Sequence, residues 1–199
     1  MLIALNAMVF ILEQTLTGRQ LQIFTMVYGL VPAELNVTSL LTSMFLHAGW
    51  MHFLGNMLYL WIFGDNIEDR LGHGRFLLFY LACGAAAGVG QTMSNPTSLV
   101  PMIGASGAIA GVMGAYFLLF PHSRVLTFVW LIIYFDVLEI PAIFFLGFWF
   151  FMQLLSGVGS IGVAGGGTAF WAHAAGFAAG ASLALLLRRP ERERIEWIE

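Results

Sequence analysis

Six apolar segments, each close to the length that an α-helix needs to cross a bilayer, constrain this chain more than any other feature. The hydrocarbon core of a membrane takes about 20 residues of helix. The segments lie at about 1–16, 49–64, 75–93, 104–120, 139–156 and 168–187. Hydrophobic residues make up 59% of the 199 residues and charged residues 10%, whereas about a quarter are charged in a soluble domain. We therefore predict an all-α, polytopic membrane protein in which residues 1–199 form one compact bundle of six transmembrane helices.

The connections between the predicted helices are short, with one exception. Residues 17–46, which include Gly18, Pro32 and Asn36, are predicted to form a sizeable outer loop. The stretch 125–138 is apolar but too short to span, so we expect a lead-in to the fifth helix or a piece that lies in the membrane interface. The first segment lacks the charged start and cleavage site of a signal peptide, which predicts a true first helix and leaves open whether residues precede it.

Arginine supplies all eight basic residues and sets the expected orientation, because cytoplasmic loops are enriched in Lys and Arg. With the N-terminus inside, seven arginines fall on the inner side and only Arg19 falls outside. Both termini are therefore predicted to be cytoplasmic. The net charge of −3 gives no basic face for nucleic acid, and the single cysteine, Cys83, cannot form an intrachain disulfide.

In that topology the second, fourth and sixth helices all begin at the outer face, and polar side chains lie near the start of each. His52 and Asn56 open the second span, Ser106 opens the fourth, and His173 is near the start of the sixth. Polar and ionisable groups inside a span are costly and usually face a cavity or one another. Three separate segments therefore bring functional candidates to one depth.

Small residues recur at a spacing of four in the fourth and sixth helices, which is typical of helices that pack closely in lipid. They are Ser106, Ala110 and Gly114 on one face and Gly107 and Gly111 on another, with Gly176 and Gly180 in the sixth helix. A serine in such a face is more often a packing residue than a nucleophile. Its shared depth with His52, Asn56 and His173 favours the nucleophile, because close helices let Ser106 and His173 approach to about 2.6–3.2 Å.

This pairing predicts acyl transfer by a serine–histidine dyad. His173 would take the proton of Ser106, the alkoxide would attack a carbonyl, and His173 would return the proton to the leaving amine. Backbone amides around Ser106, at a helix start, are candidate oxyanion donors together with the side chains of His52 and Asn56, which share one helical face. No acidic third member is evident, so we expect packing to orient His173.

Five stretches of sequence add a further signal. They are Gly104-Ala-Ser106-Gly107-Ala-Ile-Ala-Gly111, His47-Ala-Gly-Trp-Met-His52-Phe-Leu-Gly-Asn56, Ala172-His173-Ala-Ala-Gly176, Gly64-Asp-Asn-Ile-Glu68-Asp-Arg-Leu-Gly72 and Trp149-Phe-Phe-Met-Gln153. Together they resemble the rhomboid intramembrane serine proteases of the bacterial, six-helix type, over nearly the whole chain. The resemblance implies a protein of the bacterial inner membrane that cleaves single-span membrane proteins without a cofactor, near the outer face. It also implies the dyad Ser106–His173 and an oxyanion site of the Ala105 and Ser106 amides with His52 and Asn56.

Two positions depart from the pattern of that family. Many rhomboids carry an aromatic residue four positions after the nucleophile, stacked on the catalytic histidine, and here that position is Ala110. The ring of His173 must therefore be held in another way. The Trp-Arg pair that many members have in the first loop is missing between residues 17 and 46. Tyr28 and Trp50 are candidates to anchor this loop in the membrane interface instead.

Two histidines have a metal-binding alternative. The spacing of His47 and His52 is five, not the i, i+4 of the H-E-x-x-H zinc motif, and no glutamate is adjacent, so no metal is predicted. His47 is instead expected to hold the first loop by hydrogen bonds. Glu13, in the first span, is expected either to pair with a neighbouring helix or to mark the polar side of its own. Supporting roles near the dyad are assigned to Gly104, Gly107 and Gly176.

Residues 157–167 contain six glycines directly before the sixth helix, so we expect little to hold this segment rigid. With the top of the fifth helix it is predicted either to gate the lateral entry of a substrate helix or to be a plain connector. The gate residues would include Phe148, Trp149, Phe151 and Met152. The competing function is a non-catalytic rhomboid-like binder or chaperone of membrane proteins, and the presence of both Ser106 and His173 argues against it.

Overall fold

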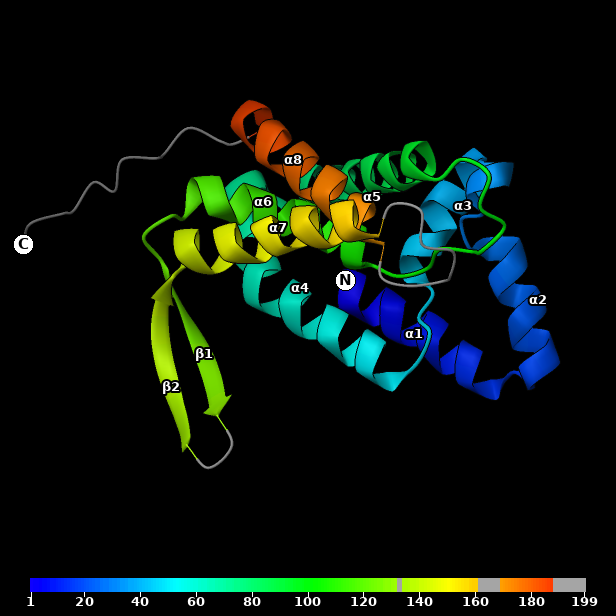
Figure 1. The fold of residues 1–199 in the computed structure, drawn as a ribbon, viewed down its shortest axis with the longest axis horizontal. Helices are drawn as coiled ribbons and strands as arrows, with labels where there is room; N and C mark the ends of the chain where they lie inside the picture. Colours follow the sequence, from blue (N-terminus) through cyan, green and yellow to red (C-terminus); the bar gives the residue numbers. More distant parts are fainter. Residues whose placement is uncertain (132–133, 161–168, 188–199) are drawn as a thin grey trace, which may run out of the picture.

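The computed structural model describes residues 1–131, 134–160 and 169–187 and shows a helical bundle with one β-hairpin at its side (Figure 1). The bundle helices are α1 (Leu2–Thr15), α4 (Trp50–Leu71), α5 (His73–Ser94), α6 (Ser106–Leu119), α7 (Ala142–Gly159) and α8 (Phe170–Leu187). They follow the six predicted apolar segments in order, so the prediction of a helical membrane bundle is confirmed. Within the described residues, α5, α7 and α8 are long and apolar enough to cross a membrane, and α1 and α6 are shorter apolar helices.

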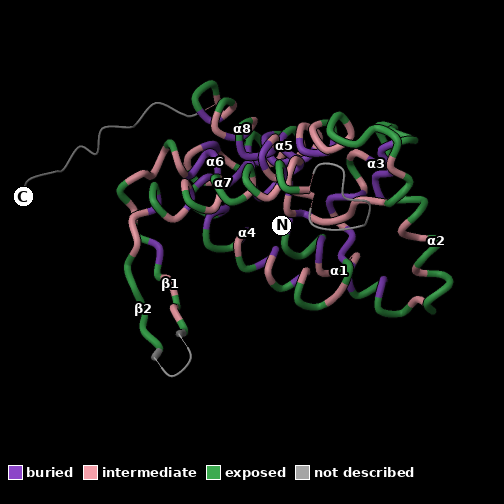
Figure 2. Tube along the Cα trace, in the orientation of Figure 1, coloured by how far each residue is buried: buried purple, intermediate pink, exposed green. Residues whose placement is uncertain are grey.

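Helix α6 lies at the centre of the bundle. Every residue from Gly107 to Tyr116 is buried, and the helix contacts α4, α5, α7 and α8. Figure 2 shows the buried part of the trace gathered around α6 and its neighbours, with exposed residues on α2 and on the hairpin. A helix that is apolar on all sides, as α6 is, is expected to occupy such a central position.

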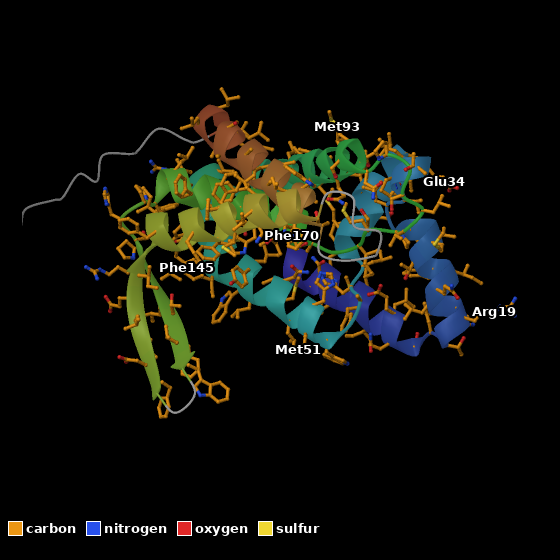
Figure 3. The ribbon with its side chains drawn as sticks, viewed as in Figure 1. Arg19, Glu34, Met51, Met93, Phe145 and Phe170 are labelled. Carbon is orange, nitrogen blue, oxygen red and sulfur yellow. The ribbon has the colours of Figure 1, made fainter. Side chains whose placement is uncertain are left out.

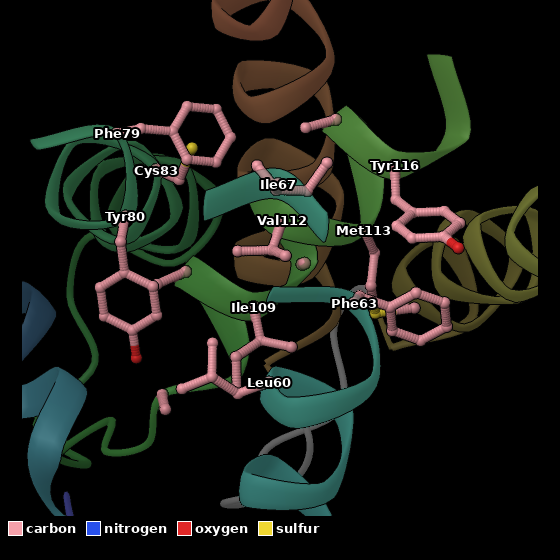
Figure 4. Close-up of a cluster of buried hydrophobic side chains, with 14 of the residues drawn as sticks. Leu60, Phe63, Ile67, Phe79, Tyr80, Cys83, Ile109, Val112, Met113 and Tyr116 are labelled. Carbon is pink, nitrogen blue, oxygen red and sulfur yellow. The ribbon is translucent and has the colours of Figure 1, made fainter. Parts of the chain in front are cut away.

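A cluster of large buried side chains fills the space where α4, α5 and α6 meet (Figure 4). The residues labelled there are Leu60, Phe63, Ile67, Phe79, Tyr80, Cys83, Ile109, Val112, Met113 and Tyr116. Phe63 and Tyr116 meet edge to face with ring centroids 5.0 Å apart. Because lipid tails are as apolar as these side chains, this core stabilises the bundle through close packing and dispersion rather than through removal of apolar surface from water.

Helices α6 and α8 approach each other closely enough for backbone contact. A Cβ atom added at Gly176 would overlap the carbonyl oxygen of Gly107, and one added at Gly180 would overlap the carbonyl oxygen of Gly111. Only glycine fits at such positions, as is common where helices pack in membranes. The close approach predicted from the glycine spacing is therefore present.

The predicted outer loop 17–46 is largely helical. It contains α2 (Gly18–Tyr28), the short 3-10 helices η1 (Pro32–Glu34) and η2 (Ser43–Phe45), and α3 (Val37–Thr42). Local capping explains the difference. The Thr17 amide donates to the side-chain oxygen of Gln20 at 2.9 Å, and the Ser39 amide donates to the side-chain oxygen of Asn36 at 2.9 Å. Asn36 is thus an N-cap and Pro32 begins a helical turn, so both are start signals rather than signs of irregular chain.

The second predicted span was too short. Helix α4 continues past residue 64 to Leu71, so the segment Gly64–Gly72, which the predicted spans leave as a connection, is helical in all but its last residue. Gly72 ends the helix with a φ of 84°. A positive φ of this size favours glycine, which has no Cβ to clash with the backbone. The change of direction between α4 and α5 therefore rests on this one residue.

The stretch 125–138 is not a lead-in to a helix but most of a β-hairpin of β1 (Arg124–Leu131) and β2 (Tyr134–Pro141). The strands are antiparallel, with Val129 opposite Asp136. The β-branched and aromatic residues of β1 favour a strand. Figure 1 shows the hairpin projecting from the end of the bundle where α6 ends and α7 begins. Helix α7 accordingly starts at Ala142 rather than at residue 139.

Large apolar side chains also cover the outside of the bundle. Met51, Met93 and Phe144 are mostly exposed, and Figure 3 shows Met51 and Met93 pointing away from the helices. Monomeric soluble proteins rarely expose apolar surface on this scale. Apolar side chains on the outside and tight packing inside are what a lipid environment requires.

Candidate active site

The structure brings Ser106 and His173 into contact. The Oγ atom of Ser106 and the Nε2 atom of His173 are 2.9 Å apart. Ser106 is the first residue of α6, and His173 lies in the first turn of α8. The backbone contact between Gly107 and Gly176 lies beside this pair and holds the two helices together at the same level. Two supporting glycines predicted from the sequence thus set the distance between the two polar side chains.

The other side of the His173 ring faces α7. Its Nδ1 atom lies 2.8 Å from Oε1 of Gln153, and the ring of Trp149 lies at a centroid distance of 5.8 Å and a tilt of 36°. Packing against Trp149 thus contributes to the orientation of His173, as expected, and an unpredicted hydrogen bond to Gln153 holds the ring as well. Ala110 offers no ring, and α7 supplies the aromatic contact in its place.

Sequence reasoning gave Gln153 no role of its own. A signal was available, because a glutamine within the apolar span Ala142–Gly159 is costly unless it meets a polar partner. Its position four residues after Trp149 places both side chains on one face of α7. What the sequence does not contain is the rotation of α7 that turns this face towards His173.

His52 is held so that its free nitrogen is a donor. The backbone amide of Ala48 donates to Nδ1 of His52 at 3.3 Å, which leaves the hydrogen of a neutral ring on Nε2. A Cβ atom added at Gly104 would lie 2.7 Å from Nε2 of His52 and 3.7 Å from Nδ2 of Asn56. Both donors therefore reach the backbone that leads into Ser106. Gly104 is required there twice, by this approach and by its φ of 125°.

Asn56 adds a second side-chain donor near Gly104. Its side chain is buried, and its Nδ2 atom has no hydrogen-bond partner among the described residues. An unpaired buried donor costs free energy, so its presence beside Gly104 calls for an explanation. The first amides of α6, beginning with Ser106, likewise have no acceptor within the helix. These groups form a cluster of donors beside the Ser106 hydroxyl.

His47 acts through its backbone rather than through its ring. Its amide donates to the two carboxylate oxygens of Glu13 at 3.2 and 3.1 Å, which gives Glu13 the neighbour that the sequence left open. Both ring nitrogens of His47 lack a partner within the described residues. The ring packs edge to face against His52 at 5.2 Å. Burial and the neighbouring His52 lower the pKa of His47 to about 4.

The predicted gate residues have different surroundings. Trp149 lies against His173, whereas Phe148, Phe151 and Met152 are exposed on the outer surface of α7. In the glycine-rich segment, 157–159 are the last residues of α7 rather than part of a connection, and 161–167 lie outside the described residues.

Comparison with known proteins gives a consistent result. A family profile described as the Rhomboid domain matches residues 34–190. The chain is 40% identical over 77 residues to the putative rhomboid protease YdcA of Bacillus subtilis, which covers 39% of this chain and 38% of that protein. It is 45% identical over 76 residues to the rhomboid protease GluP of the same organism, covering 38% and 14%. It is 35% identical over 95 residues to the mitochondrial rhomboid protein 1 of Saccharomyces cerevisiae, covering 46% and 28%. The matches thus span less than half of each relative.

Proposed function

Because the chain belongs to the rhomboid family, we propose that it is a serine endopeptidase that cleaves membrane proteins through a dyad of Ser106 and His173. The observation that carries this proposal is the 2.9 Å contact between Ser106 Oγ and His173 Nε2. This distance is within the hydrogen-bond reach that a nucleophile and its general base need. The named relatives include a rhomboid protease, which supports the same reaction.

The reaction proceeds by acyl transfer. Nε2 of His173 takes the proton of the Ser106 hydroxyl, and Oγ attacks the carbonyl carbon of the peptide bond. The tetrahedral intermediate collapses as His173 passes that proton to the leaving amine, which leaves an acyl group on Ser106. A water molecule, activated by the same nitrogen, then releases the acyl group and restores the serine. No cofactor enters these steps.

The donor cluster beside Ser106 supplies the oxyanion hole. Charge develops on the carbonyl oxygen only in the transition state, so donors without a partner in the resting enzyme are the ones that stabilise it. Asn56 Nδ2 has no partner within the described part of the chain, and the ring of His52 presents Nε2–H towards the same backbone. The amides of Ala105 and Ser106 complete the set. This role accounts for the unpaired amide of Asn56.

The length of α6 suggests the depth of the dyad. Fourteen residues span about 21 Å at about 1.5 Å per residue, less than the roughly 30 Å of the hydrocarbon core. Arg124 follows the end of α6 opposite Ser106, and arginines favour the cytoplasmic side. With that end at the inner boundary, Ser106 lies beneath the outer one. The substrates that fit this position are single-span membrane proteins whose helix unwinds near the outer face, with α7 as the element past which they enter.

Labelling by a fluorophosphonate probe tests the dyad directly. We expect the purified protein in detergent to be labelled and both Ser106→Ala and His173→Ala to remain unlabelled. Ser182→Ala is the matched control, because Ser182 is exposed on α8 and its hydroxyl donates to the backbone carbonyl of Ala178 in the same helix. Equal labelling of all four proteins would refute the dyad. Capture of a single-span protein in proteoliposomes, with neither labelling nor cleavage, would instead indicate the non-catalytic binder.

A further inference from the structure

The His173 ring is held at both of its nitrogens. Nε2 faces the Ser106 hydroxyl at 2.9 Å and Nδ1 faces Oε1 of Gln153 at 2.8 Å. A neutral imidazole carries one hydrogen, on either nitrogen. Since an amide oxygen only accepts, the bond to Gln153 requires the hydrogen on Nδ1. Nε2 is then left with the lone pair that a base needs in order to take the serine proton.

We propose that Gln153 is a positioning residue for the reaction proposed above: its side-chain oxygen fixes His173 in the tautomer that can deprotonate Ser106. The three side chains then form a chain from Gln153 through His173 to Ser106. Within the described residues Gln153 bonds His173 and not Ser106, so it would act on the serine through the histidine. It takes the position that a carboxylate holds in a serine–histidine–aspartate triad.

A glutamine suits this place for an electrostatic reason. A carboxylate within a span would have to be desolvated, which is expensive for a charge and much less so for an amide. The amide oxygen still accepts the Nδ1–H bond and so still selects the tautomer. The amide lacks the full negative charge with which a carboxylate would stabilise the imidazolium formed during the reaction.

Trp149 gives α7 a second contact with the ring of His173. Gln153 holds the edge of the His173 ring at Nδ1, and Trp149 contacts the ring from one turn earlier on α7. Residues four apart on a helix lie on one face, so one orientation of α7 supplies both contacts. An outward displacement of α7 would remove both together. The alignment of the dyad therefore depends on the position of α7.

Two substitutions at one position test the tautomer argument. Gln153→Met keeps the length of the side chain and removes the acceptor. We expect the rate of fluorophosphonate labelling and kcat for a membrane substrate to fall roughly ten- to hundredfold, since only a minor fraction of rings then carries the reactive tautomer, with KM unchanged. Gln153→Glu restores an acceptor-only group. We expect it to recover labelling at pH 8 and to move the acidic limb of the pH–rate profile to higher pH by about one unit, because a carboxylate favours the charged imidazolium.

Leu155→Ala is the matched control, because Leu155 is exposed on α7 two residues beyond Gln153; we expect its labelling rate and pH profile to match those of the wild type. The proposal is overturned if Gln153→Met labels at the wild-type rate with an unchanged pH profile while Ser106→Ala stays unlabelled, a result that leaves the dyad intact. It is equally overturned if Leu155→Ala loses as much activity, or if Gln153→Glu neither restores labelling nor shifts the limb, since either result indicates a packing role. Labelling of Ser106→Ala would instead contradict the proposed function itself.

Discussion

The surfaces that α8 presents to α6 and to α7 are built differently. Towards α6 the contact is backbone on backbone, and a Cβ atom added at Gly180 would overlap the carbonyl oxygen of Gly111. Towards α7 the contact is made by side chains, with Phe150 stacked on Phe177 at a centroid distance of 4.5 Å. Backbone contacts have one arrangement, whereas side chains can repack. The first surface is therefore rigid and the second adaptable.

Because of this difference, the distance within the Ser106–His173 pair and the orientation of its imidazole depend on different helices. The distance between Ser106 and His173 depends on the rigid contact between α6 and α8, and the orientation of the imidazole depends on α7. In a bundle built in this way, a displacement of α7 would leave the serine and the histidine at the same distance. The glycines thus preserve the distance while the aromatic side chains allow movement.

The largest effect is expected from breaking the rigid surface. Gly180→Val would force α6 and α8 apart, because the added carbons meet backbone atoms that cannot move aside. Overpacking costs about 1–3 kcal/mol or more. We expect a clear fall in Tm in detergent and at least a hundredfold loss of fluorophosphonate labelling.

Gly147→Ala on α7 is the matched control for the glycine prediction. A Cβ atom there would lie 3.5 Å from the Phe117 ring, an ordinary contact, so we expect Tm and labelling close to those of the wild type. A Gly180→Val protein with wild-type Tm and labelling would contradict the view that the glycine contact sets the distance within the dyad.

A residue that belongs to neither surface separates activity from stability. Asn56→Ala removes a donor that has no partner among the described residues, so the folded state loses no hydrogen bond there. We expect kcat to fall by about 10²–10³, the usual cost of one oxyanion donor, with Tm nearly unchanged. Kinetics in proteoliposomes and thermal unfolding of the same sample provide the measurement. A fall in Tm with unchanged kcat would assign Asn56 to the core instead.

A smaller effect is expected when the adaptable surface is loosened. Phe150→Ala removes the stack on Phe177 without touching His173. We expect a modest loss of Tm and a several-fold change in KM for a membrane substrate, because α7 is less firmly held. The pH profile of labelling should stay unchanged, since Gln153 is still present. A shift of that profile would show that the stack, rather than the hydrogen bond to Gln153, determines the state of His173.

The sequence was sufficient for the features that depend on periodicity and composition. Apolar length located the six helices, and the arginines placed the starts of three of them at one depth. The spacing of Gly107 and Gly111 against Gly176 and Gly180 then implied close contact. Together these inferences predicted that Ser106 lies next to His173. Local sequence is enough for this prediction, because it shows where a helix lies and which of its faces carries the small residues.

The features that the sequence did not reveal depend on how the elements turn towards one another. Gln153 meets His173 only because of the rotation of α7, and the spacing of an almost wholly apolar helix does not define one buried face. The partner of Glu13 is a backbone amide, which carries no residue-specific signal. The helices within 17–46 and the hairpin at 124–141 are decided by capping and β-propensity over a few residues.

The smallest effect is expected on the side of the dyad that faces α1. The pKa of His47 falls from its usual 6.5 to about 4, so between these values the unfolded chain binds a proton that the folded protein does not. The contribution of His47 to stability is then complete above about pH 6.5 and is lost as the pH falls towards 4. We expect Tm to fall further between pH 7.5 and 5 in the wild type than in His47→Phe, because phenylalanine binds no proton. The phenylalanine ring can keep the edge contact that His47 makes with Phe53, and the backbone amide still donates to Glu13. If Tm falls by the same amount in both proteins, the pH dependence of stability comes from another group. The neighbouring His52 would then be the next residue to replace.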